Sequence, residues 1–432
     1  MSAEAQPGLA PNLLDARLGP LRRLYDSEPP PGFPADLRIA VAEIGDSRAF
    51  GPSASDAAGV GWTWFDAGAA RAAAVGEAVE RSFGQQVPAD LRRASYEELR
   101  RLGEDALDPA RLALYSEDQY RSALCPFVPF RRDLRVFWTR GRRLGSGTAA
   151  WLPASLVWTT FFEVAPGEPR THGTPFSGIA AGRTPTEAER AALLELCERD
   201  AVEMGWASGE PLVRLVSPPL EALCAGPEGR FEAAHYAFPS ALDLPVVGTL
   251  VRDRETGRVA FGSACRPSWI AAARKAAAEG FQLLAVAASL DDPESPAMRR
   301  APHLGLKPWR ANRAYRGAYR EDLADAGDLL CHLQLYLDPQ MAEPLAARLA
   351  GGATIALADA PSPNLSELEG RIAALDRWSV DLTSAPLAAA GVALARVIVP
   401  GWVGNAPAAW PYLGGERRAR RGFEVRLPPP YA

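Results

Sequence analysis

The chain has 432 residues, the length of two or three ordinary domains or of one large fold with insertions. Hydrophobic residues make up 47% and charged residues 23%, a composition typical of globular proteins and not of disordered or fibrous chains. With 47 Lys and Arg against 52 Asp and Glu, the net charge is −5. This acidity argues against a general nucleic-acid-binding protein, because such proteins carry a basic excess.

The five cysteines are scattered and odd in number, so neither a disulfide framework nor a CxxC metal motif is present, and a reducing cytoplasm is expected. The amino terminus lacks the basic-then-apolar layout of a signal peptide. The longest apolar stretch, 387–403, is interrupted by a charge and a proline, so no membrane association is expected.

In chain order, regular structure is first expected at a strand over 37–41, preceded by a loosely ordered lead-in rich in Pro, Ala and Gly. The segment 135–164 has aromatic and β-branched runs around a Gly-Ser-Gly turn, which predicts a hairpin and further strands. Ala-rich helical segments lie between these runs, so we expect a mixed α and β core. We divide the chain into a lead-in with the first strand, 1–58, a core, 59–385, and a C-terminal segment, 386–432.

A repeat emerges when the helices are aligned by their expected caps. Asp66, Thr184 and Ser268 each suit an N-cap, because a side-chain oxygen can accept from the free N–H groups at a helix start. Eleven residues after each cap comes a glutamate, and another polar residue follows three positions later on the same face of the helix. The three pairs are Glu77 and Glu80, Glu195 and Glu198, and Glu279 and Gln282.

The glutamates of the second helix stand in a nearly apolar run and are expected to face the interior. Glu187, Glu195 and Glu198 fall on one side of that helix at about 100° per residue, and like charges repel unless a cation lies among them. Clustered Glu oxygens suit Mg²⁺, which binds carboxylates and phosphate oxygens. Two less specific interpretations stay open: Arg81 and Arg199 could neutralise the glutamates as ion pairs, and Glu187 could belong to a helix capping box.

Motifs for other chemistries are absent from the sequence. There is no GxxxxGK[ST] loop, no GxGxxG motif and no GxSxG elbow, so a nucleotide would be held through metal ions and basic side chains. The stretch 307–320 interleaves basic residues with Trp309, Tyr315 and Tyr319. This pattern favours a solvated basic face, with a docking surface for a peptide or partner subunit as the alternative.

At these residues the sequence resembles the YcaO family, ATP-dependent enzymes that modify peptide backbones. The resemblance runs from about residue 59 to the last residue and rests on GWTWFDAGAARAAAVGEAVERSFG, WLPASLV, SGIAAGRTPTEAERAALLELCERDAV, AARKAAAEGFQ, and ARVIVPGWVG with PYLGGER. It implies the family's own α+β fold with mixed, mainly antiparallel sheets, in which Ala-rich helices carry glutamates into a central nucleotide cleft. ATP and Mg²⁺ are the implied cofactors.

The resemblance also implies roles for particular residues. The implied cofactor-binding residues are Glu77, Glu80, Glu187, Glu195, Glu198, Arg199, Glu279, Gln282 and Arg417, of which Glu77, Glu80, Glu195 and Glu198 would bind the metal. The end of the chain is similar to the proline-rich tail of azoline-forming members, and Pro428, Pro430 and Ala432 occupy its implied catalytic positions. The chain departs from the family pattern at Val60, Ser177, Arg183 and Ala432.

The implied activity is ATP-dependent cyclodehydration, which converts Cys, Ser or Thr of a ribosomally made precursor peptide to thiazoline or oxazoline by phosphorylating the backbone amide oxygen. Thioamide or macroamidine formation is the alternative chemistry, and a non-catalytic YcaO scaffold subunit is the alternative class. The implied partners are the precursor peptide and a separate leader-peptide-binding protein related to ubiquitin-activating-type enzymes, because 1–58 is too short for a recruiting domain. We expect a homodimer within a larger complex.

Overall fold

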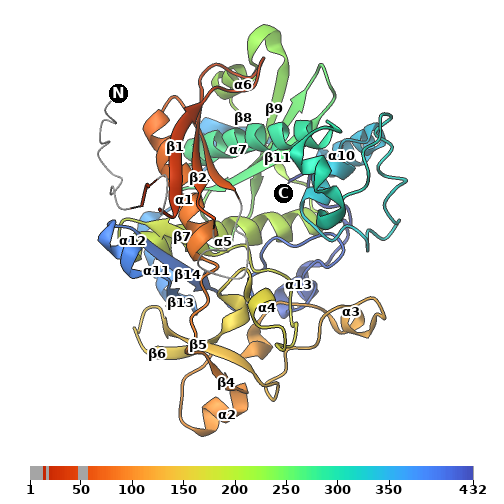
Figure 1. Cartoon of the computed structure of the whole chain (residues 1–432). Coiled ribbons are helices and arrows are strands. Elements are labelled where there is room, and N and C mark those ends of the chain that lie inside the picture. The colour runs from red at the N-terminus through yellow and green to blue at the C-terminus, as the bar shows by residue number, and fades with distance from the viewer. Residues whose placement is uncertain (1–12, 16–18, 47–56, 432) are drawn as a thin grey trace.

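The computed structural model describes residues 13–15, 19–46 and 57–431, in which three sheets are covered by helices (Figure 1). The strands are β1 (Leu21–Ser27), β2 (Leu37–Ile44), β3 (Ala58–Trp64), β4 (Arg92–Ala94), β5 (Val136–Arg143), β6 (Ala149–Pro153), β7 (Ile179–Gly182), β8 (Val213–Val216), β9 (Phe231–Phe238), β10 (Val246–Asp253), β11 (Val259–Cys265), β12 (Thr354–Ala356), β13 (Trp378–Asp381) and β14 (Ala393–Ile398). The α-helices are α1 (Ala67–Phe83), α2 (Tyr96–Arg101), α3 (Glu117–Arg121), α4 (Phe161–Val164), α5 (Pro185–Ala207), α6 (Pro218–Cys224), α7 (Trp269–Leu290), α8 (Pro296–Arg299), α9 (Leu330–Leu335), α10 (Ala342–Leu349), α11 (Leu365–Ala374), α12 (Ala385–Ala389) and α13 (Glu416–Arg421).

The expected mixed, mainly antiparallel sheets are confirmed. A three-stranded sheet has the order β1-β2-β3, and a five-stranded sheet has the order β11-β10-β9-β8-β12. A six-stranded sheet has the order β4-β5-β13-β14-β7, with β6 paired to β5. Among the named strands described here, only β8 and β12 pair in parallel.

Two expectations for local structure are partly wrong. The strand over 37–41 is confirmed as part of β2, but β1 pairs with it from within the expected lead-in. Most side chains of β1 are exposed, so the sequence carries no alternation of buried and exposed positions to reveal it. The sheet continues into β3, so the boundary at residue 58 cuts through one sheet. The hairpin of β5 and β6 is confirmed, but the aromatic run after it forms the short helix α4.

The three helices of the sequence repeat begin at the predicted caps. The side chains of Asp66, Thr184 and Ser268 accept hydrogen bonds from backbone N–H groups in the first turns of α1, α5 and α7, respectively. Each helix follows a strand, since β3 precedes α1, β7 precedes α5 and β11 precedes α7. The repeat in the sequence is therefore a repeated strand-and-helix unit.

Two of these helices lie directly on the main chain of their strands. A Cβ added at Gly61 of β3 would lie 2.0 Å from the Ala70 carbonyl oxygen of α1, and one at Gly262 of β11 would lie 2.2 Å from the Ala276 carbonyl oxygen of α7. Small residues on both sides allow this approach. The positions of α1 and α7, and of the glutamates they carry, are thus fixed by main-chain contact with the sheets.

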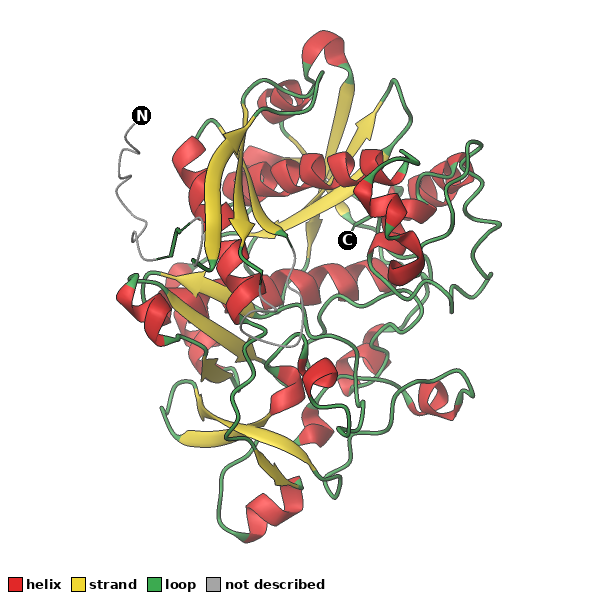
Figure 2. Ribbon diagram, in the orientation of Figure 1, coloured by secondary structure: helices red, strands yellow, loops and turns green. Residues whose placement is uncertain are grey.

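Helix α5 connects the two larger sheets. It is 23 residues long, packs against β7 and β14 on one side and β11 on the other, and runs through the middle of the molecule (Figure 2). The main hydrophobic core surrounds α5 and α7 on the five-stranded sheet. No helix in the described parts of the chain combines the length and apolar character needed to cross a bilayer.

The basic, aromatic stretch 307–320 is not a solvated face throughout, so that expectation is wrong in part. Tyr315 and Tyr319 are buried, and only Trp309 keeps a substantial exposed area. Arg313 pairs with Asp291, whose side chain is 7% exposed. Tyr315 and Tyr319 therefore belong to the core.

Candidate functional site

The two glutamates of α1 each accept a hydrogen bond from the main chain of a neighbouring strand. The N–H of Val60 on β3 donates to Glu77 Oε2 at 2.6 Å, and the N–H of Ala181 on β7 donates to Glu80 Oε1 at 2.8 Å. Glu77 Oε1 also accepts from Arg81 at 2.6 Å, so the ion pair considered for Arg81 is present. Helix α1 thereby places two carboxylates between two sheets.

The two glutamates of helix α5 also accept hydrogen bonds from the main chain of neighbouring segments. The N–H of Gly178, just before β7, donates to Glu195 Oε2 at 3.0 Å. Glu198 is buried and accepts from Ser263 Oγ at 2.7 Å and from the N–H of Cys265 at 3.1 Å, both on β11. All four predicted metal ligands are thus oriented by main-chain N–H groups of adjacent segments.

The third helix and one arginine complete the group. Glu279 on α7 is half-buried and pairs with Lys275 at 3.2 Å, and Gln282 lies one turn further along, also half-buried. Arg199 Nη1 lies 3.6 Å from Glu198 Oε1. We call Glu77, Glu80, Glu195, Glu198 and Glu279, together with Arg199, the acidic group.

Glu187 is not part of the acidic group. Its side chain is 46% exposed at the first turn of α5, and its carboxylate pairs with Arg183 at 3.1 Å. Thr184 Oγ1 accepts the N–H of Glu187 at 3.2 Å, as a capping box requires, but the Glu187 carboxylate returns to the N–H of Arg183 and not to that of Thr184. A role for Glu187 in ATP binding stays a prediction.

The pKa shifts show that the charges of the acidic group face one another. Burial raises the pKa of Glu80 well above its usual range, and the Glu195 carboxylate adds to the rise. Burial also raises the pKa of Glu198 to about 7, with a further contribution from Glu279. Burial alone would lower the pKa of Arg199, but the surrounding carboxylates outweigh it and raise that pKa. The nearby cations are Arg81, Lys275, Arg199, Arg266 and Arg396, and burial still raises the pKa values of Glu80, Glu195 and Glu198.

The donor set of the acidic group fits a hard cation bound together with a phosphate. No three His, Cys, Asp or Glu side chains of the described residues form a ready-made metal cage. Mg²⁺ is usually held by one or two carboxylates and takes its remaining oxygens from water and phosphate, so no such cage is needed. Burial raises the pKa values of Glu80 and Glu195, and a cation between them would keep both ionised.

Arg417, which the resemblance implies is a cofactor-binding residue, pairs with Asp200 and not with the acidic group. Its two Nη atoms donate to the two carboxylate oxygens of Asp200 at 2.7 Å each, and Nη1 also donates to the Gly401 carbonyl at 3.0 Å. Asp200 is 1% exposed and accepts the N–H of Val403 at 3.0 Å. Arg417 therefore ties α13 and the loop after β14 to α5, and its role in ATP binding stays a prediction.

Replacing Asp200 by asparagine is expected to destabilise the protein by roughly 2–4 kcal/mol, because it leaves the Arg417 charge without a partner in a partly buried place. Urea unfolding followed by circular dichroism measures the change. Glu117→Gln, which removes a fully solvated ion pair with Arg121, is the control and should leave the free energy of unfolding unchanged. Equal unfolding curves for Asp200→Asn and the wild type would contradict this assignment.

The proline-rich tail is buried against the five-stranded sheet. Pro428–Tyr431 are all buried, and Ala432 lies outside the described residues. The N–H of Phe261 on β11 donates to the Pro430 carbonyl at 2.7 Å, and the Tyr336 hydroxyl donates to the Pro428 carbonyl at 2.7 Å. The tail therefore lies along the edge strand β11, whose other end reaches Glu198.

The end of the tail contacts the arginine of the acidic group, a contact that sequence reasoning missed. The Tyr431 ring lies 6.0 Å from the Arg199 guanidinium, and its hydroxyl donates to the carboxylate of Glu203. Burial raises the pKa of Glu203 to about 7. Asp200 and Glu203 follow Glu198 on α5. The sequence analysis predicted a role for Glu198 but not for these two residues, because their positions on the helix did not mark them. Nothing in the sequence marks Tyr431 beyond its place in the tail.

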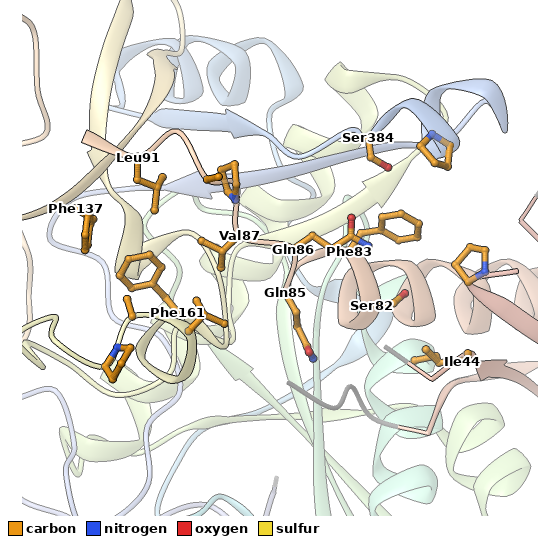
Figure 3. A pocket seen from close by; sticks show the side chains of 18 of the residues that line it. Ile44, Ser82, Phe83, Gln85, Gln86, Val87, Leu91, Phe137, Phe161 and Ser384 are labelled. Carbon is orange, nitrogen blue, oxygen red and sulfur yellow. The ribbon is translucent and has the colours of Figure 1, made fainter. Parts of the chain in front are cut away.

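A large cavity is separate from the acidic group. It has a volume of about 1020 Å³ and lies beyond the C-terminal end of α1, with none of the acidic group in its lining. Figure 3 shows the largely apolar side chains around it, among them Ile44, Phe83, Val87, Leu91, Phe137 and Phe161. The position of this cavity therefore does not coincide with the acidic group.

Comparison with known proteins agrees with this geometry. Residues 65–403 match the model of a family described as YcaO cyclodehydratase, ATP- and Mg²⁺-binding. A curated protein described as an uncharacterized protein in the tfuA 3′ region of Rhizobium leguminosarum bv. trifolii is 28% identical over 257 residues, which cover 52% of this chain and 54% of that protein. The match thus spans about half the length of that relative.

Several solved structures share the fold. A heterocyclase in complex with substrate and cofactor has a TM-score of 0.63 at 18% identity, covering 91% of this chain and 51% of that chain. YcaO from Methanopyrus kandleri bound with AMPPCP and Mg²⁺ has a TM-score of 0.56 at 19% identity, covering 90% of each chain. The E. coli microcin synthetase McbBCD complex has a TM-score of 0.58 at 12% identity, covering 94% of this chain and 96% of that chain. The fold expected from the sequence is confirmed.

Proposed function

The chain belongs to the YcaO family, and from this premise we propose that it is the ATP-dependent cyclodehydratase subunit that forms azolines in a ribosomally made precursor peptide. Its substrate residues are Cys, Ser or Thr, which become thiazolines or oxazolines. The observation that carries the proposal is the convergence of carboxylates from α5 and α7 on Arg199, next to the buried tail, with Glu80 of α1 close to Glu195. This convergence unites the two features of the sequence that pointed to azoline formation.

ATP and Mg²⁺ are the ligands of the acidic group in this proposal. ATP supplies a phosphoryl group that converts the amide oxygen of the peptide into a leaving group. Glu77, Glu80, Glu195 and Glu198 hold Mg²⁺, because carboxylate oxygens are its preferred protein ligands. Arg199 neutralises negative charge at the same place, so the protein acts mainly by positioning and electrostatic stabilisation.

Val60 shows how the site accommodates a departure from the family pattern. Family members often carry Lys there, whereas in this chain the position contributes its backbone N–H to Glu77. That hydrogen bond does not depend on the side chain, so the orientation of Glu77 is kept. A cationic side chain is lost at this position, and Arg183, which is 86% exposed, is a candidate to replace its charge.

The subunit acts, in this proposal, within an assembly. A separate leader-peptide-binding protein related to ubiquitin-activating-type enzymes presents the precursor, and a homodimer of this chain forms the catalytic part. We place the assembly in the cytoplasm, where thiols of the precursor stay reduced. The similar microcin synthetase is itself a complex, McbBCD.

The test is to combine the protein with its partner, the precursor peptide, Mg²⁺ and ATP, and to follow peptide mass and phosphate release together. We expect the peptide to lose the mass of one water for each ring formed, with phosphate release that depends on the precursor. A reaction without the precursor is the control and should release little phosphate. ATP consumption with exchange of oxygen for sulfur in the peptide, or with no change of mass, would contradict azoline formation.

A further inference from the structure

Arg396 is a buried, charged side chain, and one of its hydrogen-bond donors has no acceptor among the described residues. It lies on β14 with 0% of its surface exposed. Its Nε donates to the Val157 carbonyl at 3.0 Å and its Nη1 to the Ser177 carbonyl, but its Nη2 has no partner among the described residues. A charged donor that is withdrawn from water and left without an acceptor is unfavourable. An acceptor from outside the chain would therefore stabilise Arg396.

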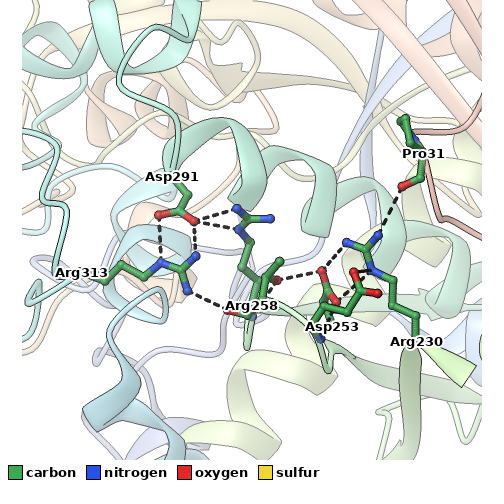
Figure 4. Close-up of polar contacts among 8 residues, drawn as sticks. Pro31, Arg230, Asp253, Arg258, Asp291 and Arg313 are labelled. Atoms are coloured by element: carbon green, nitrogen blue, oxygen red, sulfur yellow. Dashed lines mark hydrogen bonds and ion pairs between the residues drawn. The ribbon is translucent and has the colours of Figure 1, made fainter.

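Two arginines in this fold that are only partly buried pair with carboxylates. Arg230 forms two hydrogen bonds with Asp253, at 3.0 and 2.7 Å, and Arg258 donates to Asp291 at 2.9 Å (Figure 4). No carboxylate of the described residues lies within ion-pair distance, 4.0 Å, of Arg396. Within the described parts of the chain, the buried Arg348 and Arg418 also donate only to main-chain carbonyls. Arg396 differs from Arg348 in that one of its donors, Nη2, has no acceptor among the described residues.

Arg396 lines a small cavity that adjoins the acidic group. The cavity has a volume of about 100 Å³, and its other walls include Ser177, Leu196, Trp402 and Asn405. Leu196 follows Glu195 on α5, and Ser177 precedes the N–H of Gly178 that orients Glu195. The carboxylates of Glu80 and Glu195 are close enough to raise the pKa of Arg396, although burial lowers it to about 10, so the group stays cationic at neutral pH.

The cavity suits a small peptide side chain and not a nucleotide. Its lining is mostly apolar, and its volume is far below the roughly 300–1,000 Å³ of sites that hold drug-sized ligands. One buried guanidinium N–H in such a lining provides a directed donor for a single oxygen. A residue the size of Cys, Ser or Thr, preceded by a backbone carbonyl, has this combination of small volume and one strong acceptor.

We propose that this cavity receives the Cys, Ser or Thr residue to be cyclised, with Arg396 Nη2 donating a hydrogen bond to the carbonyl oxygen of the preceding residue. The inference rests on the proposed function and extends it to the peptide side of the site. When the side-chain sulfur or oxygen attacks, its electron pair forms the bond to the carbonyl carbon, the C=O π electrons move to the oxygen, and the proton of the nucleophile passes to solvent. Arg396 stabilises the charge that develops on that oxygen and keeps its own proton.

The test compares Arg396→Gln with the wild type in the full assembly with precursor, Mg²⁺ and ATP. We expect kcat for ring formation to fall by about 100-fold or more, as for loss of one donor to a developing oxyanion, while the affinity for ATP analogues changes little. Arg258→Gln is the matched control, because it also removes a partly buried arginine but leaves Asp291 paired with Arg313. The control should keep the wild-type kcat.

A second variant probes the cavity without changing the buried charge. A Cβ at Gly404 would lie 3.1 Å from Ser177 Oγ, so Gly404→Ala narrows the cavity. We expect it to lower ring formation at Thr, the largest of the three residues, more than at Ser. This variant keeps the proposal testable if Arg396→Gln does not fold.

The outcomes separate this inference from the proposed function. If the wild type forms no rings, the proposed function fails. If the wild type forms rings and Arg396→Gln forms them equally fast, only the role of Arg396 fails. A parallel loss of ATP-analogue affinity in Arg396→Gln would overturn the inference by placing the arginine on the nucleotide side, and an unchanged ratio of Thr to Ser cyclisation in Gly404→Ala would overturn the assignment of the cavity.

Discussion

Replacing both Glu195 and Glu198 by glutamine is expected to reduce precursor-dependent ATP turnover by about 100-fold or more, the scale seen when one preorganised electrostatic contact is lost, and to abolish its dependence on Mg²⁺. Glutamine keeps an oxygen for the N–H groups of Gly178 and Cys265 but carries no charge to bind the cation. The chain should remain folded, because a neutral amide is easier to bury than a carboxylate. Phosphate release measured over a series of Mg²⁺ concentrations provides the result.

Glu189→Gln is the matched control for this variant. Glu189 lies on the same helix, α5, but pairs with Arg142 at 2.6 Å and accepts from Ser379 Oγ at 2.7 Å, away from the acidic group. The control should keep its turnover and its Mg²⁺ dependence. If the double variant at positions 195 and 198 also kept both, with assembly intact, the chain would act as a non-catalytic scaffold.

Removal of 428–432 is expected to reduce ring formation by about 100-fold or more, again on the scale of a lost preorganised contact, while ATP binding is retained. The tail contributes no carboxylate to the acidic group, and Arg199 keeps Glu198 as a partner at 3.6 Å after the loss of Tyr431. We expect slower ring formation because the N–H of Phe261 on β11 loses the Pro430 carbonyl and the Glu203 carboxylate loses the Tyr431 hydroxyl. Peptide mass and binding of a fluorescent ATP analogue are measured on the same preparation.

A single substitution refines the truncation experiment. Tyr431→Phe removes only the hydrogen bond to Glu203 and leaves the ring beside Arg199. Arg420→Ala, in an exposed part of α13, serves as the control for changes near the end of the chain. If the truncated protein modified the peptide at the wild-type rate, that result would favour thioamide or macroamidine chemistry, in which the tail is not expected to act.

The sequence predicted the parts of the site that depend on local pattern. Each strand-and-helix unit has an N-cap residue, Asp66, Thr184 or Ser268, and a glutamate at a fixed distance after it. The spacing recurs because each helix begins with a capped first turn and places a carboxylate at the same position along its length. The structure brings Glu77, Glu80, Glu195, Glu198 and Glu279 together, as the convergence of three helices requires. Their roles toward Mg²⁺ and ATP stay predictions.

What the sequence did not reveal depends on contacts between distant segments. The strand β1 has mostly exposed side chains, so only its pairing with β2 defines it. The contact of Tyr431 with Arg199 joins residues more than half the chain apart, and no local pattern encodes it. Arg396 was visible only as a charge that interrupts an apolar run, and its unpaired donor could be recognised only once its neighbours were placed.

The contact between β3 and α1 limits how this protein can change. A side chain at Gly61 would meet the Ala70 carbonyl at 2.0 Å, so any larger residue must lift the whole helix off the sheet. Glu77 and Glu80 would move with the helix, so under their proposed role a substitution selected for its effect on folding would alter cation affinity at the same time. Over evolution, stability and cofactor use in this half of the molecule can therefore be tuned only jointly.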